Sequence, residues 1–387
     1  MIPYGRQDIN SADLEAVDEV LRSDWLTQGP MVPRFEESLI NFTGAEYAVA
    51  VNSSTSALHI SCLALGVGSG DIVWTSPNTF VASANAALYC GAKVDFVDID
   101  SNSFNMSVES LEEKLEWAEL HNQLPKVVIP VHFAGQSCNM AAINALSKKY
   151  GFSIIEDASH AIGGAYFDEL IGSCKYSDIT VFSFHPVKII TTGEGGVSLT
   201  NDMQLAKSMQ QYRTHGITND DKFMLPRPND EIWNYQQITL GFNYRMTDIQ
   251  AALGISQLDR LNDFVLKRNE IAHLYNTALS EFPIIPQSQI SEVFSSFHLY
   301  PILIRESECG KNQQQIYYQM RRSGIAVNLH YIPVYRQPYF ESLGFKLGYC
   351  KNAEQYYKET ISLPMYPSLS SSDQDKVINI LKAGLNL

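Results

Sequence analysis

Apolar runs and segments of helical periodicity alternate between residues 46 and 199 of this 387-residue chain. The apolar runs are short and rich in β-branched residues, and turn-forming residues follow them, which is typical of strands. Because the runs are continuously apolar, we expect strands that are buried on both faces. The alternation predicts an α/β fold with a large, mostly parallel sheet. The predicted strands occupy residues 46–51, 71–77, 92–99, 126–133, 152–157, 179–184 and 197–199.

The pattern outside this region predicts a first helix and a smaller unit at the other end of the chain. Residues 10–23 carry apolar side chains at helical spacing. Residues 201–245 are polar, so we expect mainly loops there, and Thr247 with Gln250 forms a capping box that opens a long helix. The remainder predicts an α+β unit, with helices near 267–281, near 311–323 and from Ser372, and strands near 297–304 and 325–330.

The composition excludes several classes of partner. The formal net charge is −14, and an acidic protein is poorly suited to bind nucleic acids or anionic membranes. The six cysteines are scattered without a CxxC pair, as expected for reduced thiols in the cytoplasm. The start of the chain lacks the features of a signal peptide, and no apolar run approaches the roughly 20 residues that span a bilayer. We therefore expect a soluble, cytoplasmic protein.

Residues 183–196 (SFHPVKIITTGEGG) place a single lysine at the exit of a predicted strand, in a loop shaped by proline and glycine. Lys188 is flanked by Val187 and Ile189, so we expect its side chain to be partly desolvated. Desolvation lowers the pKa of a lysine because it penalises the ammonium relative to the amine. A free amine can attack an aldehyde and form a Schiff base. The alternative is a loop lysine whose stem packs while its ammonium stays in water.

A carboxylate and an imidazole follow another predicted strand end. In parallel sheets, ligands bind outside the carboxyl ends of the strands. If Lys188 holds the aldehyde of pyridoxal phosphate, the ring nitrogen of that cofactor needs a carboxylate, and Asp157 closes a buried strand. His160 is one turn further on and is placed to donate to the phenolate oxygen. The alternative for Asp157 is a helix N-cap.

Hydroxyl groups and an aromatic ring follow other predicted strand ends. Ser54 and Thr55 open a helix, where free backbone N–H groups suit a phosphate, and Ser183 offers a further hydroxyl. Phe80 is placed to stack on the cofactor ring. The alternatives are ordinary N-capping for the two helix-start residues and core packing for Phe80. We expect no metal site and no serine hydrolase, because the histidines lack ligand spacing and no GxSxG motif occurs.

Several motifs resemble those of the pyridoxal-phosphate-dependent sugar-nucleotide aminotransferases of the DegT–DnrJ–StrS type, from Ile2 to about Leu381. They are NSSTSALH (52–59), SPNTFVASANA (76–86), EDASHAIGG (156–164), SFHPVKIITTGEGG (183–196), GFNYRMTDIQAALG (241–254) and HYIPVYRQPYF (330–340). Two departures are Ile189, where proline is expected after the lysine, and SSTS at 53–56, where many relatives have a glycine.

The resemblance implies the fold of pyridoxal-phosphate-dependent transferases of fold type I, like that of aspartate aminotransferase. It implies a large cofactor-binding α/β domain over residues 1–250 and a small C-terminal α+β domain over residues 251–387. It also implies a homodimer, because Asn243 is expected to reach the cofactor phosphate of the neighbouring subunit. No nucleic-acid or membrane partner is expected.

The resemblance also implies roles for individual residues. Lys188, Asp157 and His160 are the expected catalytic residues, at the cofactor aldehyde, the ring nitrogen and the phenolic oxygen respectively. The other expected cofactor-binding residues are Ser54, Thr55, Phe80, Ser183 and Asn243. The expected substrate-binding residues are Tyr4, Thr27, His330 and Tyr331.

Within the family, the PYGRQDI opening, LTQGP at 26–30 and the lysine motif resemble most the enzymes that form UDP-4-amino-4,6-dideoxy-N-acetyl-β-L-altrosamine for pseudaminic acid. The implied reaction transfers an amino group from L-glutamate, by way of pyridoxamine phosphate, to C4 of a UDP-linked 4-keto-6-deoxy-N-acetylhexosamine. An alternative is the same transamination of a bacillosamine-type UDP sugar or a dTDP-linked hexulose. Two further alternatives are a deoxygenating dehydratase, in which histidine replaces Lys188, and a non-catalytic cofactor-binding regulator.

Overall fold

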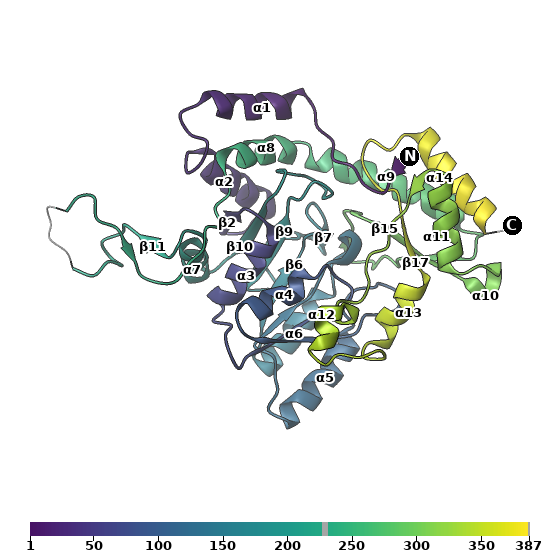
Figure 1. Ribbon diagram of the computed structural model, residues 1–387, viewed down its shortest axis with the longest axis horizontal. Coiled ribbons are helices and arrows are strands. Elements are labelled where there is room, and N and C mark those ends of the chain that lie inside the picture. Colours follow the sequence, from purple (N-terminus) through teal and green to yellow (C-terminus); the bar gives the residue numbers. More distant parts are fainter. Residues whose placement is uncertain (227–230, 386–387) are drawn as a thin grey trace.

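A seven-stranded sheet forms the centre of the computed structural model, which describes residues 1–226 and 231–385 (Figure 1). Its strands lie in the order β2-β10-β9-β6-β5-β3-β4. Every pair from β9 through β6, β5 and β3 to β4 is parallel, so the predicted mostly parallel sheet is confirmed. The strands are β2 (Tyr47–Val51), β3 (Ile72–Thr75), β4 (Lys93–Phe96), β5 (Val127–Ile129), β6 (Ser153–Asp157), β9 (Ile179–Ser183) and β10 (Gly196–Thr200).

Strand β10 is the exception, because it runs antiparallel to both of its neighbours, β2 and β9. A parallel connection needs a crossover, usually through a helix. The connection from β9 to β10 is the loop that carries Lys188, and it contains no helix. The chain therefore turns back beside β9.

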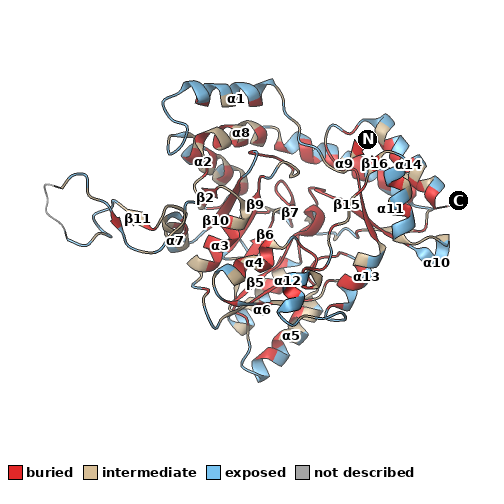
Figure 2. Cartoon of the chain, viewed as in Figure 1, coloured by how far each residue is buried: buried red, intermediate tan, exposed pale blue. Residues whose placement is uncertain are grey.

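Helices cover both faces of the sheet, which explains the continuously apolar strands (Figure 2). On β6, Ile155 belongs to the apolar cluster under α3 (Ser54–Ala64) and α4 (Ala82–Tyr89). Ile154 points to the opposite face and packs with α5 (Val108–Leu120) and α6 (Met140–Tyr150). Successive strand residues point to opposite faces, so each strand contributes to two cores. A third cluster joins α2 (Met31–Thr43) and α8 (Asp248–Leu258), and α1 (Ser11–Arg22) packs on the outside of α8.

The C-terminal part has an apolar core of its own. The antiparallel strands β13 (Ile284–Pro286), β15 (Tyr300–Ile304) and β17 (Thr360–Leu363) pack with α9 (Leu261–Leu279), α11 (Gln313–Arg322) and α14 (Ser371–Gly384). Strand β1 (Ile2–Pro3) joins this part by pairing with β16 (Ile325–Ala326). The start of α9 packs instead in the cluster of α2 and α8, through Leu261, Phe264 and Val265. The domain boundary near residue 250 stays a prediction.

The polar segment that was expected to form loops contains a helix, so that expectation was wrong for α7 (Met203–Arg213). Asp202 caps this helix by accepting hydrogen bonds from the backbone amides of Gln204 and Leu205. Only Ala206 and Met209 are buried, which explains the weak apolar signal. The short strands β11 (Ile217–Thr218) and β12 (Gln236–Gln237) follow and extend away from the body of the molecule (Figure 1).

The predicted capping box at Thr247 is confirmed at the start of α8, while the strand predicted near 325–330 is limited to β16. No helix among the described residues has the length and apolar character needed to cross a bilayer. The remaining elements are β7 (Ala165–Tyr166), β8 (Glu169–Leu170), β14 (Val293–Phe294), α10 (Glu306–Cys309), α12 (Pro338–Ser342), α13 (Lys351–Glu359) and two 3-10 turns at Phe133–Gly135 and Val334–Arg336.

Candidate active site

A cavity of about 980 Å³ opens at the carboxyl ends of the parallel strands. Its walls come from the start of α3, the turn before α4, the ends of β6 and β9, and residues 328–332 of the C-terminal part. Thr27 and Asn243 do not line this cavity. The cavity brings together ten of the residues expected from sequence: Tyr4, Ser54, Thr55, Phe80, Asp157, His160, Ser183, Lys188, His330 and Tyr331.

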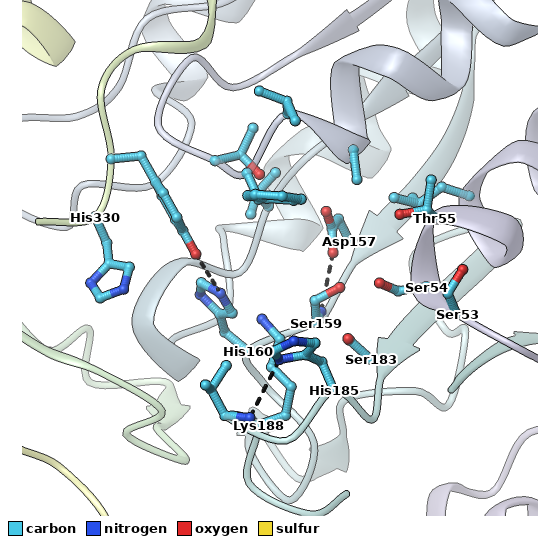
Figure 3. Close-up of a pocket in the computed structure, with 18 of the residues that line it drawn as sticks. Ser53, Ser54, Thr55, Asp157, Ser159, His160, Ser183, His185, Lys188 and His330 are labelled. Atoms are coloured by element: carbon cyan, nitrogen blue, oxygen red, sulfur yellow. Dashed lines mark hydrogen bonds between the residues drawn. The ribbon is translucent and has the colours of Figure 1, made fainter. Parts of the chain in front are cut away.

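Lys188 lies in the loop between β9 and β10, and its side chain lines the cavity (Figure 3). The loop is anchored on both sides of Lys188, because Phe184 before it and Ile189 and Ile190 after it are buried in the cluster that includes α2. Burial lowers the pKa of Lys188 to about 8, although the negative charge of Asp157 opposes this shift. An amine with this pKa is a far better nucleophile at neutral pH than an ordinary lysine. The Lys188 side chain has no hydrogen-bond or ion-pair partner among the described residues.

Asp157 is the last residue of β6 and is only 5% exposed. Its Oδ2 accepts a hydrogen bond of 2.6 Å from Ser83 Oγ, and its Oδ1 accepts one of 3.1 Å from the Ser159 amide. Turns, and not a helix, follow β6, so the alternative role as a helix N-cap does not apply. Within the described chain, no cation is bonded to this carboxylate, and a buried carboxylate without a counter-ion is costly. A protonated ring nitrogen therefore fits this position.

His160 presents a hydrogen-bond donor to the cavity. Its Nδ1 lies 3.3 Å from the backbone amide of Ala134, which can only donate, so the neutral ring carries its proton on Nε2. Nε2 lies 3.2 Å from Tyr331 Oη. Burial, followed by the positive charge of Lys188, holds the pKa of His160 well below its ordinary value. The ring is therefore neutral, and its Nε2–H, which faces Tyr331 Oη in this structure, can donate to an anionic oxygen.

The start of α3 offers amide and hydroxyl groups at one end of the cavity (Figure 3). Ser53 caps the helix by accepting from the Ser56 amide, while the amides of Ser54 and Thr55 have no acceptor in the described chain. Gly196 packs against this turn so closely that a Cβ atom there would lie 2.5 Å from the Ser54 nitrogen. Glycine is therefore required at 196, and the backbone amides and hydroxyls together form a cradle for a phosphate.

The C-terminal part supplies a second polar wall of the cavity. His330 Nε2 lies 3.3 Å from the Asn328 side-chain amide, and its Nδ1 lies 2.9 Å from Ser362 Oγ. Burial, and then the charge of Lys188, lowers the pKa of His330 to about 3. The Tyr4 ring packs at 5.3 Å from the His330 ring. These neutral polar groups are arranged at the opposite end of the cavity from α3.

Phe80 lies in the turn before α4, and its side chain is 59% exposed on the cavity. This exposure excludes the alternative of core packing. Together with Asp157, Lys188 and the α3 cradle, Phe80 provides what a phosphorylated pyridine aldehyde requires: a ring face, a carboxylate, an amine and phosphate donors.

Residues 7–382 match the DegT/DnrJ/EryC1/StrS aminotransferase family. The chain belongs to this family. It is 38% identical over 385 residues to the spore coat polysaccharide biosynthesis protein SpsC of Bacillus subtilis, covering 98% of this chain and 96% of SpsC. It is also 38% identical over 390 residues to the UDP-4-amino-4,6-dideoxy-N-acetyl-β-L-altrosamine transaminase of Campylobacter jejuni, covering 99% and 98%.

Solved structures of aminotransferases share the whole fold. Helicobacter pylori PseC, an aminotransferase involved in the biosynthesis of pseudaminic acid, superimposes with a TM-score of 0.89 at 32% identity and covers 99% of both chains. Streptococcus pneumoniae Spr1654 in its PMP form superimposes with a TM-score of 0.89 at 30% identity and covers 100% of this chain and 99% of its own. The expected aminotransferase fold is therefore confirmed.

Sequence reasoning missed three residues of this aminotransferase that lie in or behind the cavity. Ser83 bonds to Asp157 and belongs to a motif that was used only for Phe80. His298 lines the cavity with its ring centroid 4.4 Å from that of His160, and its buried Nδ1 has no partner in the described chain. Ser53, and not Ser54, is the cap of α3. The SANA letters could have suggested Ser83, whereas no local pattern indicated His298.

Proposed function

We propose that this family member is a pyridoxal-phosphate-dependent transaminase that uses L-glutamate and a UDP-linked keto sugar. The acceptor is UDP-2-acetamido-2,6-dideoxy-β-L-arabino-hex-4-ulose, and the product is UDP-4-amino-4,6-dideoxy-N-acetyl-β-L-altrosamine for pseudaminic acid synthesis. The observation that carries the chemistry is one cavity that holds both an amine of lowered pKa, Lys188, and a buried carboxylate without a counter-ion, Asp157.

The bound cofactor supplies an aldehyde that accepts the amino group and a ring that stores the electron pair of the reacting carbon. Asp157 holds the proton on the ring nitrogen, and His160 donates Nε2–H to the phenolic oxygen. Ser54, Thr55 and Ser183 bind the phosphate, and Phe80 covers one ring face. Freed as an amine, Lys188 would move a proton from the α-carbon of glutamate to C4′ of the cofactor, and in the second half-reaction from C4′ to C4 of the sugar.

We assign the end of the cavity opposite α3 to the nucleotide sugar. Tyr4, His330 and Tyr331 line this end, and their neutral polar groups suit the hydroxyl and amide groups of a sugar. Thr27 lies outside the cavity of the same chain, so we place it at the substrate entrance of an assembled dimer. The names of the Campylobacter and Helicobacter relatives support the altrosamine product.

SpsC, which is named for a spore coat polysaccharide, is as similar to this chain as the altrosamine transaminase is. This similarity supports a second candidate class of sugar acceptor. The alternative is transamination of a bacillosamine-type UDP sugar or a dTDP-linked hexulose. Relative kcat/KM values on the three keto sugars, with glutamate as donor, decide between them. Highest kcat/KM on either alternative sugar would replace the proposed acceptor and leave the chemistry intact.

We further propose a cytoplasmic homodimer in which each cavity takes Asn243 from the other subunit. Asn243 is exposed and does not line its own cavity. The nearby segment exposes a group of large apolar side chains, which a second copy would cover. These are Phe223, Leu225, Ile232, Trp233 and Leu240. Light scattering of the purified protein tests the dimer, and a monomer at micromolar concentration would overturn it.

Visible absorbance tests the central proposal. Purified protein with bound cofactor is expected to absorb at roughly 410–430 nm, and L-glutamate is expected to convert that band to one near 330 nm, as the chemistry of the cofactor dictates. Lys188→Ala is expected to lose the visible band and multiple turnover. A colourless protein that stays colourless with added pyridoxal phosphate, or a Lys188→Ala variant that still turns over, would overturn the proposal.

A further inference from the structure

Two buried hydroxyl groups are linked to Asp157: Ser83 lies outside the cavity lining, and Thr79 lies in the cavity wall. Ser83 lies in the first turn of α4 and Thr79 lies four residues before it, and neither side chain is more than 4% exposed. Thr79 Oγ1 is 2.9 Å from Ser83 Oγ, and Ser83 Oγ is 2.6 Å from Asp157 Oδ2. The three groups form a continuous hydrogen-bonded chain from Thr79 in the cavity wall, through Ser83, to the carboxylate.

The direction of these hydrogen bonds follows from the charge of Asp157. An ionised carboxylate only accepts, so the single hydroxyl proton of Ser83 must point to Asp157. The 3.5 Å contact from Ser83 to the Phe80 carbonyl is therefore not made at the same time. With its proton committed, Ser83 accepts from Thr79. The hydroxyl of Thr79 has no other partner among the described residues, so it is the terminal donor of the chain.

This chain of donors supplies half of the protein's contacts to the carboxylate. Asp157 Oδ2 receives Ser83, and Oδ1 receives the amide of Ser159, which no side-chain substitution can remove. Donors in series polarise one another, so Thr79 strengthens the hydrogen bond that Ser83 makes. Hydrogen bonds to a charged group favour its charged form. Removing Ser83 therefore makes Asp157 a stronger base.

We propose that Ser83 and Thr79 are positioning residues that set the proton affinity of Asp157, and thereby keep the proton on the cofactor nitrogen and not on the carboxylate. This inference rests on the proposed function. Phe80 lies between the two hydroxyl residues and faces the cavity, so a single turn positions both the ring face and the carboxylate at its edge. The competing explanation is that both hydroxyls only satisfy one another inside a packed contact.

The chain offers matched variants that separate these explanations. Ser83→Ala removes the donor to Asp157, and Thr79→Val removes only the terminal donor while keeping the side-chain shape. Thr79→Ser keeps the hydroxyl and loses a methyl group. Ser61→Ala removes a hydroxyl from another buried pair, Ser61 Oγ to Ser198 Oγ at 3.0 Å, in the same apolar layer but outside the cavity.

The experiment loads each full-length variant with pyridoxal phosphate labelled with ¹⁵N in the ring. It measures the ¹⁵N chemical shift and the pH midpoint of the visible band, neither of which depends on turnover. Ser83→Ala is expected to move the ¹⁵N signal toward the unprotonated value. Its midpoint should rise by roughly half to one pH unit, because a lost hydrogen bond to a charged group shifts proton affinity by about one unit. Thr79→Val should change the ¹⁵N chemical shift and the pH midpoint in the same directions as Ser83→Ala, but by smaller amounts.

Thr79→Ser and Ser61→Ala are expected to match the unsubstituted protein in both measurements. If Ser83→Ala and Thr79→Val lower thermal stability but leave the ¹⁵N signal and the midpoint unchanged, the hydroxyls only pack and the inference is wrong. If Ser83→Ala does not fold, Thr79→Val decides alone. Failure of the proposed function has a different signature, because the unsubstituted protein would then take up no cofactor at all.

Discussion

Two carboxylates occupy neighbouring positions on β6, but the chain gives them very different hydrogen-bond partners. Glu156 and Asp157 are both 5% exposed. Because successive strand residues point to opposite faces, Asp157 faces the cavity under α3 and α4, while Glu156 faces the layer of α5 and α6. The two side chains share a strand, a formal charge and a degree of burial, so any difference between them must come from the groups that surround each one.

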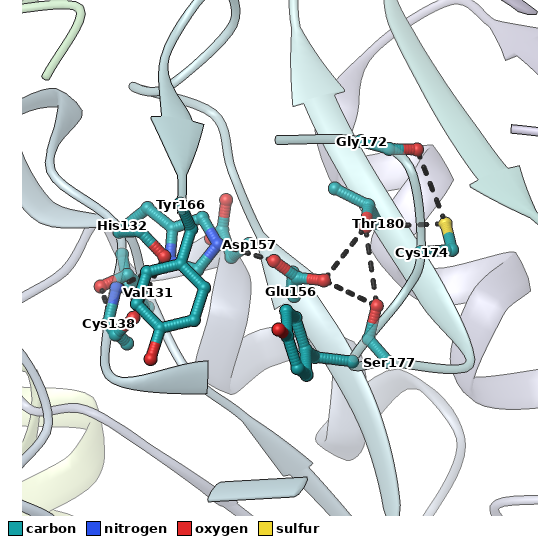
Figure 4. A network of polar contacts seen from close by, with 12 residues as sticks. Val131, His132, Cys138, Glu156, Asp157, Tyr166, Gly172, Cys174, Ser177 and Thr180 are labelled. Atoms are coloured by element: carbon teal, nitrogen blue, oxygen red, sulfur yellow. Dashed lines mark hydrogen bonds and ion pairs between the residues drawn. The ribbon is translucent and has the colours of Figure 1, made fainter. Parts of the chain in front are cut away.

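Glu156 is surrounded by donors from the chain itself (Figure 4). It accepts from His132 Nε2 at 2.6 Å, from Ser177 Oγ at 2.5 Å and from Thr180 Oγ1 at 3.2 Å. The Cys138 amide lies 3.2 Å from His132 Nδ1, and the proton on His132 Nε2 points at Glu156. Burial opposes ionisation, but the hydrogen bond and charge of His132, followed by the two hydroxyl donors, hold the pKa of Glu156 below its ordinary value.

Asp157 receives fewer donors, and the rest of its surface opens into the cavity. The chain supplies one hydroxyl and one amide, and Figure 3 shows the carboxylate between the α3 cradle and His160. The comparison teaches that burial does not distinguish a structural carboxylate from one that binds a ligand. The distinguishing property is the number of hydrogen bonds that the protein leaves unmade.

The largest expected effect is that of Asp157→Asn on turnover. An amide cannot hold a proton on the ring nitrogen, so we expect kcat to fall by roughly 10²–10⁴-fold, the range for a positioned proton-handling group. Stability of the cofactor-free protein should change little, because Asn still accepts from the Ser159 amide and its NH₂ group can donate to Ser83. Steady-state kinetics and thermal melts check both. Turnover within tenfold of the unsubstituted protein would contradict the assignment of Asp157 as the carboxylate that binds the cofactor nitrogen.

The matched substitution Glu156→Gln should lower the stability of the protein and leave its turnover nearly unchanged. Glutamine has one acceptor oxygen for three donors, and its NH₂ group must face either His132 or a hydroxyl. Leaving a buried donor unsatisfied costs about 1–3 kcal/mol. We expect urea unfolding to show this loss, while kcat of the folded variant stays within about threefold. A fall in kcat comparable with that of Asp157→Asn would show that the two carboxylates act together.

The pH dependence of cofactor capture tests whether Lys188 is the reactive amine and whether the charge of Asp157 affects it. Only the free amine of Lys188 reacts, and its pKa is about 8, so the capture rate of cofactor-free protein should rise about tenfold per pH unit below 8 and level off above. Stopped-flow absorbance with excess pyridoxal phosphate measures this rate. Because the charge of Asp157 raises the pKa of Lys188, Asp157→Asn should move the midpoint to lower pH. A midpoint near that of free lysine, about 10.4, would contradict the assignment.

The strand pattern and the residues at strand ends could be predicted because both are local in the sequence. Each apolar run carries its own signal, and a residue that closes a run is placed at the edge of the sheet. The direction of β10 could not be predicted in this way, because a connection without a helix can join antiparallel strands, as from β9 to β10, or parallel ones, as from β6 to β9. The polar helix α7 was missed because its apolar face is narrow, with only Ala206 and Met209 buried, and because its cap at Asp202 was not recognised.

Local sequence pattern also could not distinguish the role of Glu156 from that of Asp157. The donors to Glu156 come from His132, Ser177 and Thr180, and Ser83 is 74 residues from Asp157 in the chain. No periodicity connects such positions. The segments at β5 and β9, which flank β6, bring the donors to Glu156, and the first turn of α4 brings Ser83 to Asp157. Local pattern identified Asp157 at a strand end, and tertiary packing decides that Glu156, and not Asp157, is satisfied by the chain itself.

The smallest expected effect is that of Ser177→Ala, which tests whether the hydroxyl donors hold Glu156 in its ionised form. Ser177→Ala removes one donor to Glu156 and should cost about 1 kcal/mol at pH 7. A depressed pKa stabilises the fold above the unfolded value of about 4.3 and loses that contribution as pH falls through the folded pKa. The difference in urea midpoint between Ser177→Ala and the unsubstituted protein should therefore narrow below about pH 4.3. Ser61→Ala is the control, because its partners Ser198 and Met209 do not titrate in this range and its cost should stay constant. If the cost of Ser177→Ala is equally independent of pH, the hydroxyl contributes only packing, and Glu156 is not held ionised by its donors.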